Sequence, residues 1–295
     1  MKFLYLLLSV AFPAFANDYD VTWLRINAPP FSMPASSSDS GICDDIVDEI
    51  IARTPDLKHD SIHLPQMRLK GYFELGKNVC VPCLIKRDNH PLVTFSTRTS
   101  VYPPMGIVTT AQKQRSITEK HGSPVRLYSL LNDKGLRYGQ GAGRKYSPWI
   151  EQIKSRVQNN QAVTLNYRGA DQASVLGDML VNERIDFGID YPFIATYYNR
   201  HHDAQLVTLP IANNQESLVF GAIGCAKRAD NDFATTFINR INPIIRDHIL
   251  PSESYRQHQS SWLSEYFDNF AQVYEKHLLT KKPAQHAGSE KRDTN

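Results

Sequence analysis

Stretches of strand and helix character alternate along this chain, and this alternation restricts its possible folds more than any other feature. Residues 21–27 form a β-rich run, and apolar residues between 42 and 51 then recur at helical spacing. Residues 61–64 and 79–85 read as strands, with a helical pattern at 66–76 between them. Strands that alternate with helices through short connections predict a mostly parallel sheet covered by helices.

The same pattern starts again near Met105. The strands and helices of this second round are expected at residues 105–111, 134–139, 147–158, 162–167, 171–180, 184–190 and 205–210. Pro148 and Asp171 suit the starts of the two helices. A strand at 217–226 and two long helical patterns, from Phe233 and through Trp262 to Phe270, complete the chain. The pattern thus has two rounds, and a length of 295 residues, or 279 (295 − 16) without the first 16, is comfortable for two lobes.

The first 16 residues have the features of a secretory signal peptide. Lys2 precedes an apolar run at residues 3–12, and Ala14 and Ala16 form a small-residue cleavage site. A membrane anchor is the alternative, but the run is far shorter than the roughly 20 apolar residues that a spanning helix needs. We therefore expect cleavage after Ala16 and an exported, periplasmic protein that begins at Asn17.

Composition excludes some partners. With 33 basic and 30 acidic residues, the formal net charge of +3 is close to neutral for this length, and no dense basic run interleaved with aromatic residues occurs. We therefore expect no nucleic-acid partner. His201 and His202 are adjacent, so their side chains diverge, and without a third ligand at metal spacing we expect no metal and no cofactor. The polar segment 281–295 is expected to be disordered.

Four cysteines, Cys43, Cys80, Cys83 and Cys225, lie in a chain whose export would permit disulfides. The spacing of Cys80 and Cys83 is that of a thioredoxin-type redox pair, which needs its first cysteine at a helix N-terminus. Here both lie within the expected strand 79–85, where residues three apart point to opposite faces. They are badly placed to bond one another, so structural disulfides are favoured over a redox enzyme.

A set of stretches, taken in order, carries a family resemblance over nearly all of the chain after the leader. They are INAPPFSM with GICDDIVDEI, VCVPCLIKRDNHPLVTFSTRTSVYPPMGIV, GLRYGQGAGRKYSPWIEQI, LVNERIDFGIDYPFIATYY and VFGAIGCAKRADNDFATTFINRI. In these stretches the chain resembles the extracellular solute-binding proteins of family 3. These are the type II periplasmic binding proteins that serve polar amino acid transporters, and the chain is most similar to a proteobacterial branch of them.

The resemblance implies a two-lobed α/β fold that clamps a ligand between the lobes. Each lobe would have a mostly parallel sheet flanked by helices, and two crossing strands would join the lobes. Lobe 1 would comprise residues 17–104 and 216–280, and lobe 2 residues 105–215. The crossings, at 103–106 and 215–220, agree with the new strands that the pattern itself places near 105 and 217.

The resemblance also implies a disulfide pairing. In the related branch, cysteines commonly occupy the positions of Cys80 and Cys225. A Cys80–Cys225 bond is therefore expected, and it leaves Cys43 to pair with Cys83.

Amino-acid-binding members of the family hold the ligand's α-carboxylate with an arginine, whose planar guanidinium makes two parallel hydrogen bonds. That arginine usually lies seven residues before the serine of an aromatic–serine pair. Here the pair is Phe95-Ser96, and the matching position is Asn89. Arg87 lies two residues before that position and Arg98 two residues after the serine. Either Arg87 substitutes, or the ligand lacks a free α-carboxylate; a solvated loop charge is the alternative for Arg87.

The other end of the ligand is better marked. Asp190 falls where the family places the carboxylate that receives an amino group, just past an apolar strand, where open α/β sheets bind ligands. Asp186 is the rival, and its alternative role is to satisfy the strand edge. We expect an ammonium on Asp190 with Arg144 across the cleft. Because an exposed carboxylate adds little to stability, Asp190 should matter for binding and not for folding.

The glycine-rich turn 139–148 leads into a helix, where free backbone N–H groups and nearby cations suit an anion. The family resemblance implies ligand contacts in this turn; a connection that needs glycine dihedrals is the alternative. Residues that leave the first strand, including Pro30, would also approach the cleft, where Phe31 would stack on a ligand or fill the core. The candidate ligand-binding residues besides Asp190 are therefore Asn27, Phe31, Arg87, Gly143, Arg144 and Tyr146.

Together these expectations describe a monomeric periplasmic binding protein without catalytic residues. It would capture a small polar, amine-bearing, amino-acid-like solute and deliver it to the membrane permease of an ABC transporter. An adaptor that reports its ligand to a membrane sensor is the alternative. An enzyme on this fold, as in the cyclohexadienyl dehydratases, would need a cleft acid or base beyond Asp190, and no GxSxG or HExxH motif occurs.

Overall fold

The structure is a computed structural model that describes residues 20–34, 37, 39–157, 162–169 and 171–280. The expected signal peptide, the new N-terminus at Asn17 and the polar segment 281–295 lie outside the described residues. Among the helices that are described, none combines the length and the apolar character needed to cross a bilayer.

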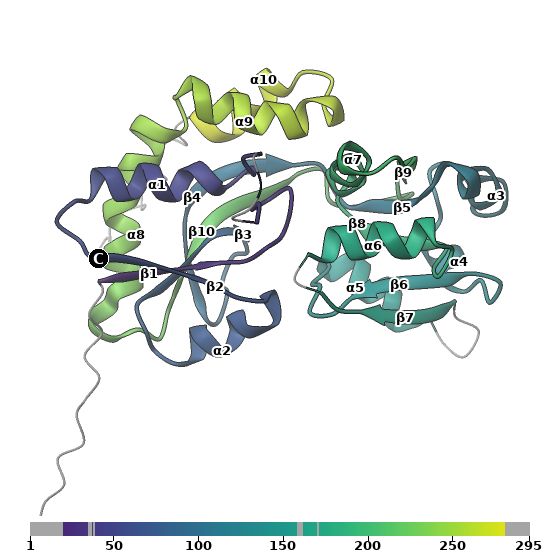
Figure 1. The fold of residues 1–295 in the computed structure, drawn as a ribbon, viewed down its shortest axis with the longest axis horizontal. Coiled ribbons are helices and arrows are strands. Elements are labelled where there is room, and N and C mark those ends of the chain that lie inside the picture. The colour runs from purple at the N-terminus through teal and green to yellow at the C-terminus, as the bar shows by residue number, and fades with distance from the viewer. Residues whose placement is uncertain (1–19, 35–36, 38, 158–161, 170, 281–295) are drawn as a thin grey trace, which may run out of the picture.

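Two five-stranded sheets organise the molecule, and we call each sheet with its helices a lobe (Figure 1). Lobe 1 has the strand order β2-β1-β3-β10-β4, formed by β1 (Val21–Arg25), β2 (His59–His63), β3 (Val79–Ile85), β4 (Val93–Tyr102) and β10 (Val219–Ala226). Lobe 2 has the order β7-β6-β8-β5-β9, formed by β5 (Gly106–Thr110), β6 (Arg137–Gly141), β7 (Val163–Tyr167), β8 (Phe187–Asp190) and β9 (Leu206–Leu209).

Four of the five strands in each sheet run in one direction. β1 pairs in parallel with β2 and β3, whereas β10 runs antiparallel to β3 and β4. In lobe 2, β6 pairs in parallel with β7 and β8, whereas β5 runs antiparallel to β8 and β9. The reversed strands, β5 and β10, are those by which the chain enters from the other lobe. The expected two-lobed α/β fold is thus confirmed, and the residue limits of the lobes stay a prediction.

Helices cover both sheets (Figure 1). Their bounds are α1 (Asp44–Arg53), α2 (Leu69–Glu74), α3 (Ala111–His121), α4 (Leu127–Leu131), α5 (Pro148–Arg156), α6 (Gln172–Val181), α7 (Pro192–His201), α8 (Phe233–Ile244), α9 (Glu253–Leu263) and α10 (Phe270–Tyr274). Short 3-10 turns lie at Gln66–Arg68, Asp230–Asp232 and Ser264–Tyr266, and π turns at Ile245–Ile249 and Glu275–Leu279. The helix starts follow local chemistry: the side chains of Ser147 and Asp171 accept hydrogen bonds from the N–H groups of Ile150 and Ser174.

The strand pattern did not indicate β4, because β4 is rich in serine and threonine. Ser96, Thr99 and Ser100 of this strand are nevertheless buried. Ser96 Oγ accepts a hydrogen bond from the N–H of Ile223 at 3.0 Å, and the carbonyl of Thr99 accepts from the side chains of two residues of α9. A buried polar residue is tolerated where it has partners, so burial of this strand depends on groups more than a hundred residues away.

The expected helix through Trp262 to Phe270 is wrong in one respect, because it is broken. α9 ends at Leu263, and the side chain of Asn269 accepts a hydrogen bond from the N–H of Gln272 at 3.1 Å and so starts α10. The sequence pattern also gave no indication of α3, α4 and α7.

The helix α9 also contacts α7 of lobe 2. The guanidinium of Arg200 donates to the carbonyl of Ser261 at 2.8 Å and lies over the ring of Trp262, 4.3 Å from its centroid. The hydroxyl of Thr196 donates to Glu265 at 2.6 Å. These contacts join the two lobes in addition to the chain crossings, and they hold the lobes close together.

Candidate functional site

The lobes face one another across a cavity of about 370 Å³. Lobe 1 lines it from α2 and from the segment between β3 and β4, and lobe 2 lines it from the turns after β6 and β8. Its principal lining residues are Leu69, Phe73, Leu84, Arg87, His90, Phe95, Gly143, Arg144, Lys145 and Tyr191. Open α/β sheets bind ligands beyond the carboxyl ends of their strands, and small-molecule sites commonly have this size, so this cavity is the candidate site.

Three other hollows lie elsewhere on the described part of the chain. One of about 630 Å³ lies between Asp20, Phe233 and Arg240 of lobe 1, and one of about 530 Å³ lies against α9 and α10. A third, of about 330 Å³, is lined in part by Pro103 and Pro104 of the chain crossing. Although the first two are larger, neither gathers residues from the carboxyl ends of strands in both lobes.

A much smaller cavity, of about 30 Å³, adjoins Arg144 and brings four of the expected site residues together. Asn27 and Phe31 of lobe 1 line it opposite Arg144 and Asp190 of lobe 2. This volume is far below the roughly 300–1,000 Å³ of small-molecule pockets. The predicted residues therefore converge between the lobes, at a place that has no room for a solute in this structure.

Asp190 and Arg144 bond to each other, and both belong to lobe 2. The guanidinium of Arg144 donates to Asp190 Oδ1, which also accepts from the N–H of Tyr191 at 2.7 Å. The expectation that Arg144 lies across the cleft from Asp190 is therefore wrong: the turn after β6 and the end of β8 are neighbours on one sheet. The ligand-binding roles of the two residues stay predictions.

Asp190 is also not the exposed carboxylate that the sequence suggested. It is 7% exposed, and burial raises its pKa above the ordinary value, although Arg144 and the Tyr191 N–H favour the charged form. A charge in such a place depends on its partner. The sequence suggested that Asp190 contributes little to stability. Because it is buried and paired with Arg144, we now expect the pair to matter for the stability of the fold.

The turn at Gly143 faces lobe 1, but Tyr146 points away from the cavity. Gly143 has φ of +78°, and a Cβ there would lie 3.2 Å from Met67 of lobe 1, so glycine suits both the backbone and the close approach. The Tyr146 hydroxyl accepts from Tyr138 at 2.8 Å inside lobe 2, and burial raises its pKa to about 12. The carbonyl of Tyr146 accepts a long, 3.5 Å hydrogen bond from Arg87 of lobe 1.

Phe31 packs into an aromatic cluster that spans the lobes, which also includes Tyr102, Tyr191 and Phe193. Its ring centroid lies 5.2, 5.7 and 5.0 Å from those of the other three. Of the two alternatives for Phe31, this structure shows the packed one. The sequence interpretation missed the other three residues because they lie 70 or more positions away in the sequence, and only the fold brings them together.

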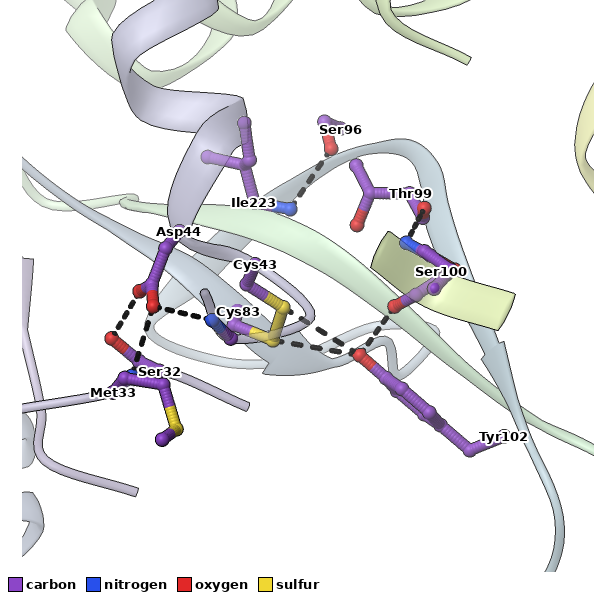
Figure 2. Close-up of a disulfide and its surroundings, with 12 residues drawn as sticks. Ser32, Met33, Cys43, Asp44, Cys83, Ser96, Thr99, Ser100, Tyr102 and Ile223 are labelled. Carbon is purple, nitrogen blue, oxygen red and sulfur yellow. Dashed lines mark hydrogen bonds between the residues drawn. A yellow bond between two sulfur atoms is a disulfide. The ribbon is translucent and has the colours of Figure 1, made fainter. Parts of the chain in front are cut away.

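The Cys43–Cys83 disulfide holds the loop that carries Phe31. Figure 2 shows Asp44, the residue after Cys43, accepting hydrogen bonds from Ser32 Oγ at 2.8 Å and from the Met33 N–H at 2.9 Å. The disulfide ties the start of α1 to β3, and the Tyr102 hydroxyl contacts both sulfur atoms, at 3.7 and 3.5 Å. The loop after β1 is therefore fixed beside the cleft.

The second disulfide joins Cys80 of β3 to Cys225 of β10, which are directly opposite one another. The two bonds are the pairings that the family resemblance implied, and Cys80 and Cys83 are not bonded to each other. The argument from opposite faces of the strand is therefore confirmed.

The remaining expected cations, Arg87 and Arg98, differ in their surroundings. Arg87 is exposed and lines the cavity, whereas the guanidinium of Arg98 lies over the ring of Phe220, 3.6 Å from its centroid. Sequence reasoning missed His90 and Phe95 as lining residues. Their signal was present in HPLVTF, the segment that opens the unrecognised strand β4.

Asp186 has a structural role at the edge of β8. It is 3% exposed, and it accepts from the backbone N–H of Arg137 at 2.7 Å, from the Arg137 guanidinium at 3.0 and 3.1 Å, and from Lys113. Burial opposes the charge of this carboxylate, but these donors outweigh it and lower its pKa to about 2. This is the alternative role that the sequence left open for Asp186.

Replacing Asp186 by asparagine should remove an acid-sensitive part of the stability. A carboxylate with a folded pKa of about 2 and an ordinary value of 3.8 stabilises the fold above pH 4 and loses that contribution as the pH falls from 4 to 2. A shift of this size contributes about 2–3 kcal/mol at neutral pH. Urea unfolding of the wild type and Asp186→Asn between pH 7 and 2 should show that difference shrinking in acid. Asp247→Asn, at an exposed acid of lobe 1, is the control, and a constant gap for Asp186→Asn would contradict the assignment.

His201 and His202 lie at the end of α7. His201 contacts the Tyr197 carbonyl at 2.8 Å and Asp39 at 3.2 Å. Over the residues for which coordinates are described, no three His, Cys, Asp or Glu side chains are placed to hold a metal ion.

Comparisons with known proteins support the fold. No family model and no curated protein matches the sequence. Among solved structures, a protein assigned as an L-cystine ABC transporter from Listeria monocytogenes is similar over 84% of this chain and 96% of its own, with a TM-score of 0.63 and 15% identity. The periplasmic VFT2 domain of BvgS from Bordetella pertussis is similar over 85% and 94%, with a TM-score of 0.56 and 19% identity. An ancestral amino acid-binding protein that is a precursor of cyclohexadienyl dehydratase is similar over 82% and 94%, with a TM-score of 0.59 and 13% identity. The chain therefore has the two-lobed fold of periplasmic binding proteins.

Proposed function

We propose that this protein is an exported solute-binding protein that closes its two lobes on a small solute and delivers it to the permease of an ABC transporter. The observation that carries the proposal is the cavity of about 370 Å³, on which residues after β3, β6 and β8 converge from both lobes. A solute that contacts both lobes favours their closed arrangement, and a membrane partner can recognise that arrangement. The likeness to a transporter-associated structure from Listeria supports this reading.

Sensing is the second candidate, and two observations favour it. The contacts of Arg200 with Ser261 and Trp262 join α7 of lobe 2 to α9 at a place outside the cavity. The fold is also similar to a periplasmic domain of BvgS. In this reading the closed protein itself is the form that a membrane sensor binds.

We propose binding and not turnover for the cleft. The buried carboxylate there, Asp190, is bonded to Arg144, so its charge serves the structure of lobe 2. The amine-bearing solute that the sequence favoured depended on a free Asp190, and this pairing removes that reason for it.

A melting screen should identify the class of solute. Purified protein would be heated with amino acids, amines and organic acids in turn, and a solute present at 100 times its Kd should add about 2.7 kcal/mol to the free energy of unfolding. Leu92→Trp, which replaces an aliphatic side chain at the wall of the cavity by a larger indole ring, should abolish the shift without unfolding the protein. No shift with any class, or an equal shift in Leu92→Trp, would contradict binding in this cavity.

A further inference from the structure

The Asp190 carboxylate in the cleft already has a cationic partner, Arg144. Asp190 Oδ1 accepts from Arg144 and from the Tyr191 N–H, and the cavity that Asp190 lines has a volume of only about 30 Å³. Asp190 does not line the larger cavity, whereas Arg144 does. An ammonium in the larger cavity would therefore meet the guanidinium of this pair and not its carboxylate.

The charged residues that line the larger cavity all have one sign. They are Lys70, Arg87, Arg144 and Lys145, and no Asp or Glu belongs to the described lining. Burial lowers the pKa of His90, and the charges of Arg87 and Lys227 lower it further, so the imidazole is neutral near pH 7. The nearby acids, Asp88 and Glu216, lie outside the lining. Arg144 is paired with Asp190, and Lys70 lies 3.6 Å from Glu74, whereas the described salt bridges include neither Arg87 nor Lys145. These two cations, one from each lobe, attract an anion and repel an ammonium.

The rest of the lining is apolar. Leu69, Phe73 and Val93 are buried, and Leu84 and Phe95 are half-buried around the same space. An apolar ligand group placed against these side chains loses contact with water, which is favourable at about 25 cal/mol for each Å² of apolar surface covered. The cavity therefore combines a cationic end, shared by both lobes, with apolar walls from lobe 1.

We propose that this cavity takes an organic carboxylate with an apolar body and no ammonium group. The carboxylate lies against Arg87 and Lys145, which come from opposite lobes, and so its binding links the lobes. The apolar body lies against Phe73 and Phe95. This inference rests on the proposed function and names the chemical class of the solute.

Two matched series of compounds test the inference by calorimetric titration. One compares 3-phenylpropanoate, L-phenylalanine and 2-phenylethylamine, and the other compares 4-methylpentanoate, L-leucine and 3-methylbutylamine. In at least one series the acid without an ammonium should bind tenfold or more tightly than the amino acid, and the amine should not bind detectably. An amino acid that binds as tightly as its deaminated acid, or more tightly, would overturn the inference and leave the proposed function intact.

Variants that change the charge of the cavity lining test where the carboxylate binds. Lys145→Glu should weaken binding of the acid at least tenfold, and Arg87→Met should also weaken it, because each removes a cation from one lobe. Lys134→Glu is the matched control, since Lys134 is an exposed lysine of the same lobe outside the cavity, and it should bind as the wild type does. Equal affinity in Lys145→Glu and wild type would overturn the inference. If none of the six compounds binds while another class stabilises the protein, the inference fails alone; if no class of solute stabilises it, the proposed function fails as well.

Discussion

Protein in which alanine replaces both Cys80 and Cys225 is expected to melt about 10–20 °C below the wild type. The bond joins two fully buried residues on neighbouring strands and closes a separation of 145 residues. In the chain-entropy account, loss of a cross-link over this separation costs roughly 5 kcal/mol. Each kcal/mol corresponds to about 2–4 °C in a protein approaching this size. Calorimetry under non-reducing conditions measures the difference.

The other disulfide provides a matched comparison. Cys43 and Cys83 are separated by 40 residues, so their replacement by alanine should cost about 1 kcal/mol less. This second variant should lose more solute affinity, because the bond holds the loop that carries Phe31 beside the cleft. A Cys80→Ala/Cys225→Ala protein that melts within about 3 °C of the wild type would show that the β3–β10 bond adds little to the fold.

Replacing Arg144 by methionine is expected to destabilise the protein by about 3–5 kcal/mol at pH 7. The substitution leaves the carboxylate of Asp190, which is 7% exposed, without its charged partner. Burial already raises the pKa of Asp190, and loss of Arg144 raises it further. A folded pKa above the unfolded value means that stability falls as the pH rises between the two. Relative to the wild type, the variant should therefore lose less stability near pH 4, close to the ordinary pKa of a carboxyl, than at pH 7, and urea unfolding of both proteins at the two pH values measures this.

The double variant Arg144→Met/Asp190→Asn is the decisive control. It removes both charges, so its free energy of unfolding should return to within about 1–2 kcal/mol of the wild type. The double-mutant cycle then gives a coupling energy between the two residues. If the losses of unfolding free energy in Arg144→Met and Asp190→Asn simply add up in the double variant, Asp190 does not depend on Arg144, and the description of this pair would be contradicted.

Local patterns in the sequence predicted much of the fold. The expected strand at 79–85 has the bounds of β3, and Pro148 and the cap at Asp171 start the expected helices. The two-residue repeat of a strand also placed Cys80 and Cys83 on opposite faces, which by itself argued against a bond between them. These features could be predicted because each depends on residues within a few positions of one another.

The candidate site could be predicted from the sequence only in part. The ends of the strands near Gly143 and Asp190 follow from the α/β pattern, and the structure places both residues between the lobes. The bond of Arg144 to Asp190 joins residues 46 positions apart, and the direction of the Tyr146 side chain depends on packing inside lobe 2. No local pattern carries this information.

The sequence by itself determined the two-lobed α/β class, the separation of Cys80 from Cys83 and the strand ends from which a cleft is built. Tertiary structure decided what those ends do: it buried the polar strand β4, paired Asp190 with Arg144 and assembled the aromatic cluster around Phe31. The physical reason is that hydrogen bonding, burial and charge depend on the neighbours of a group in space. In this chain those neighbours come from segments that are far apart in the sequence.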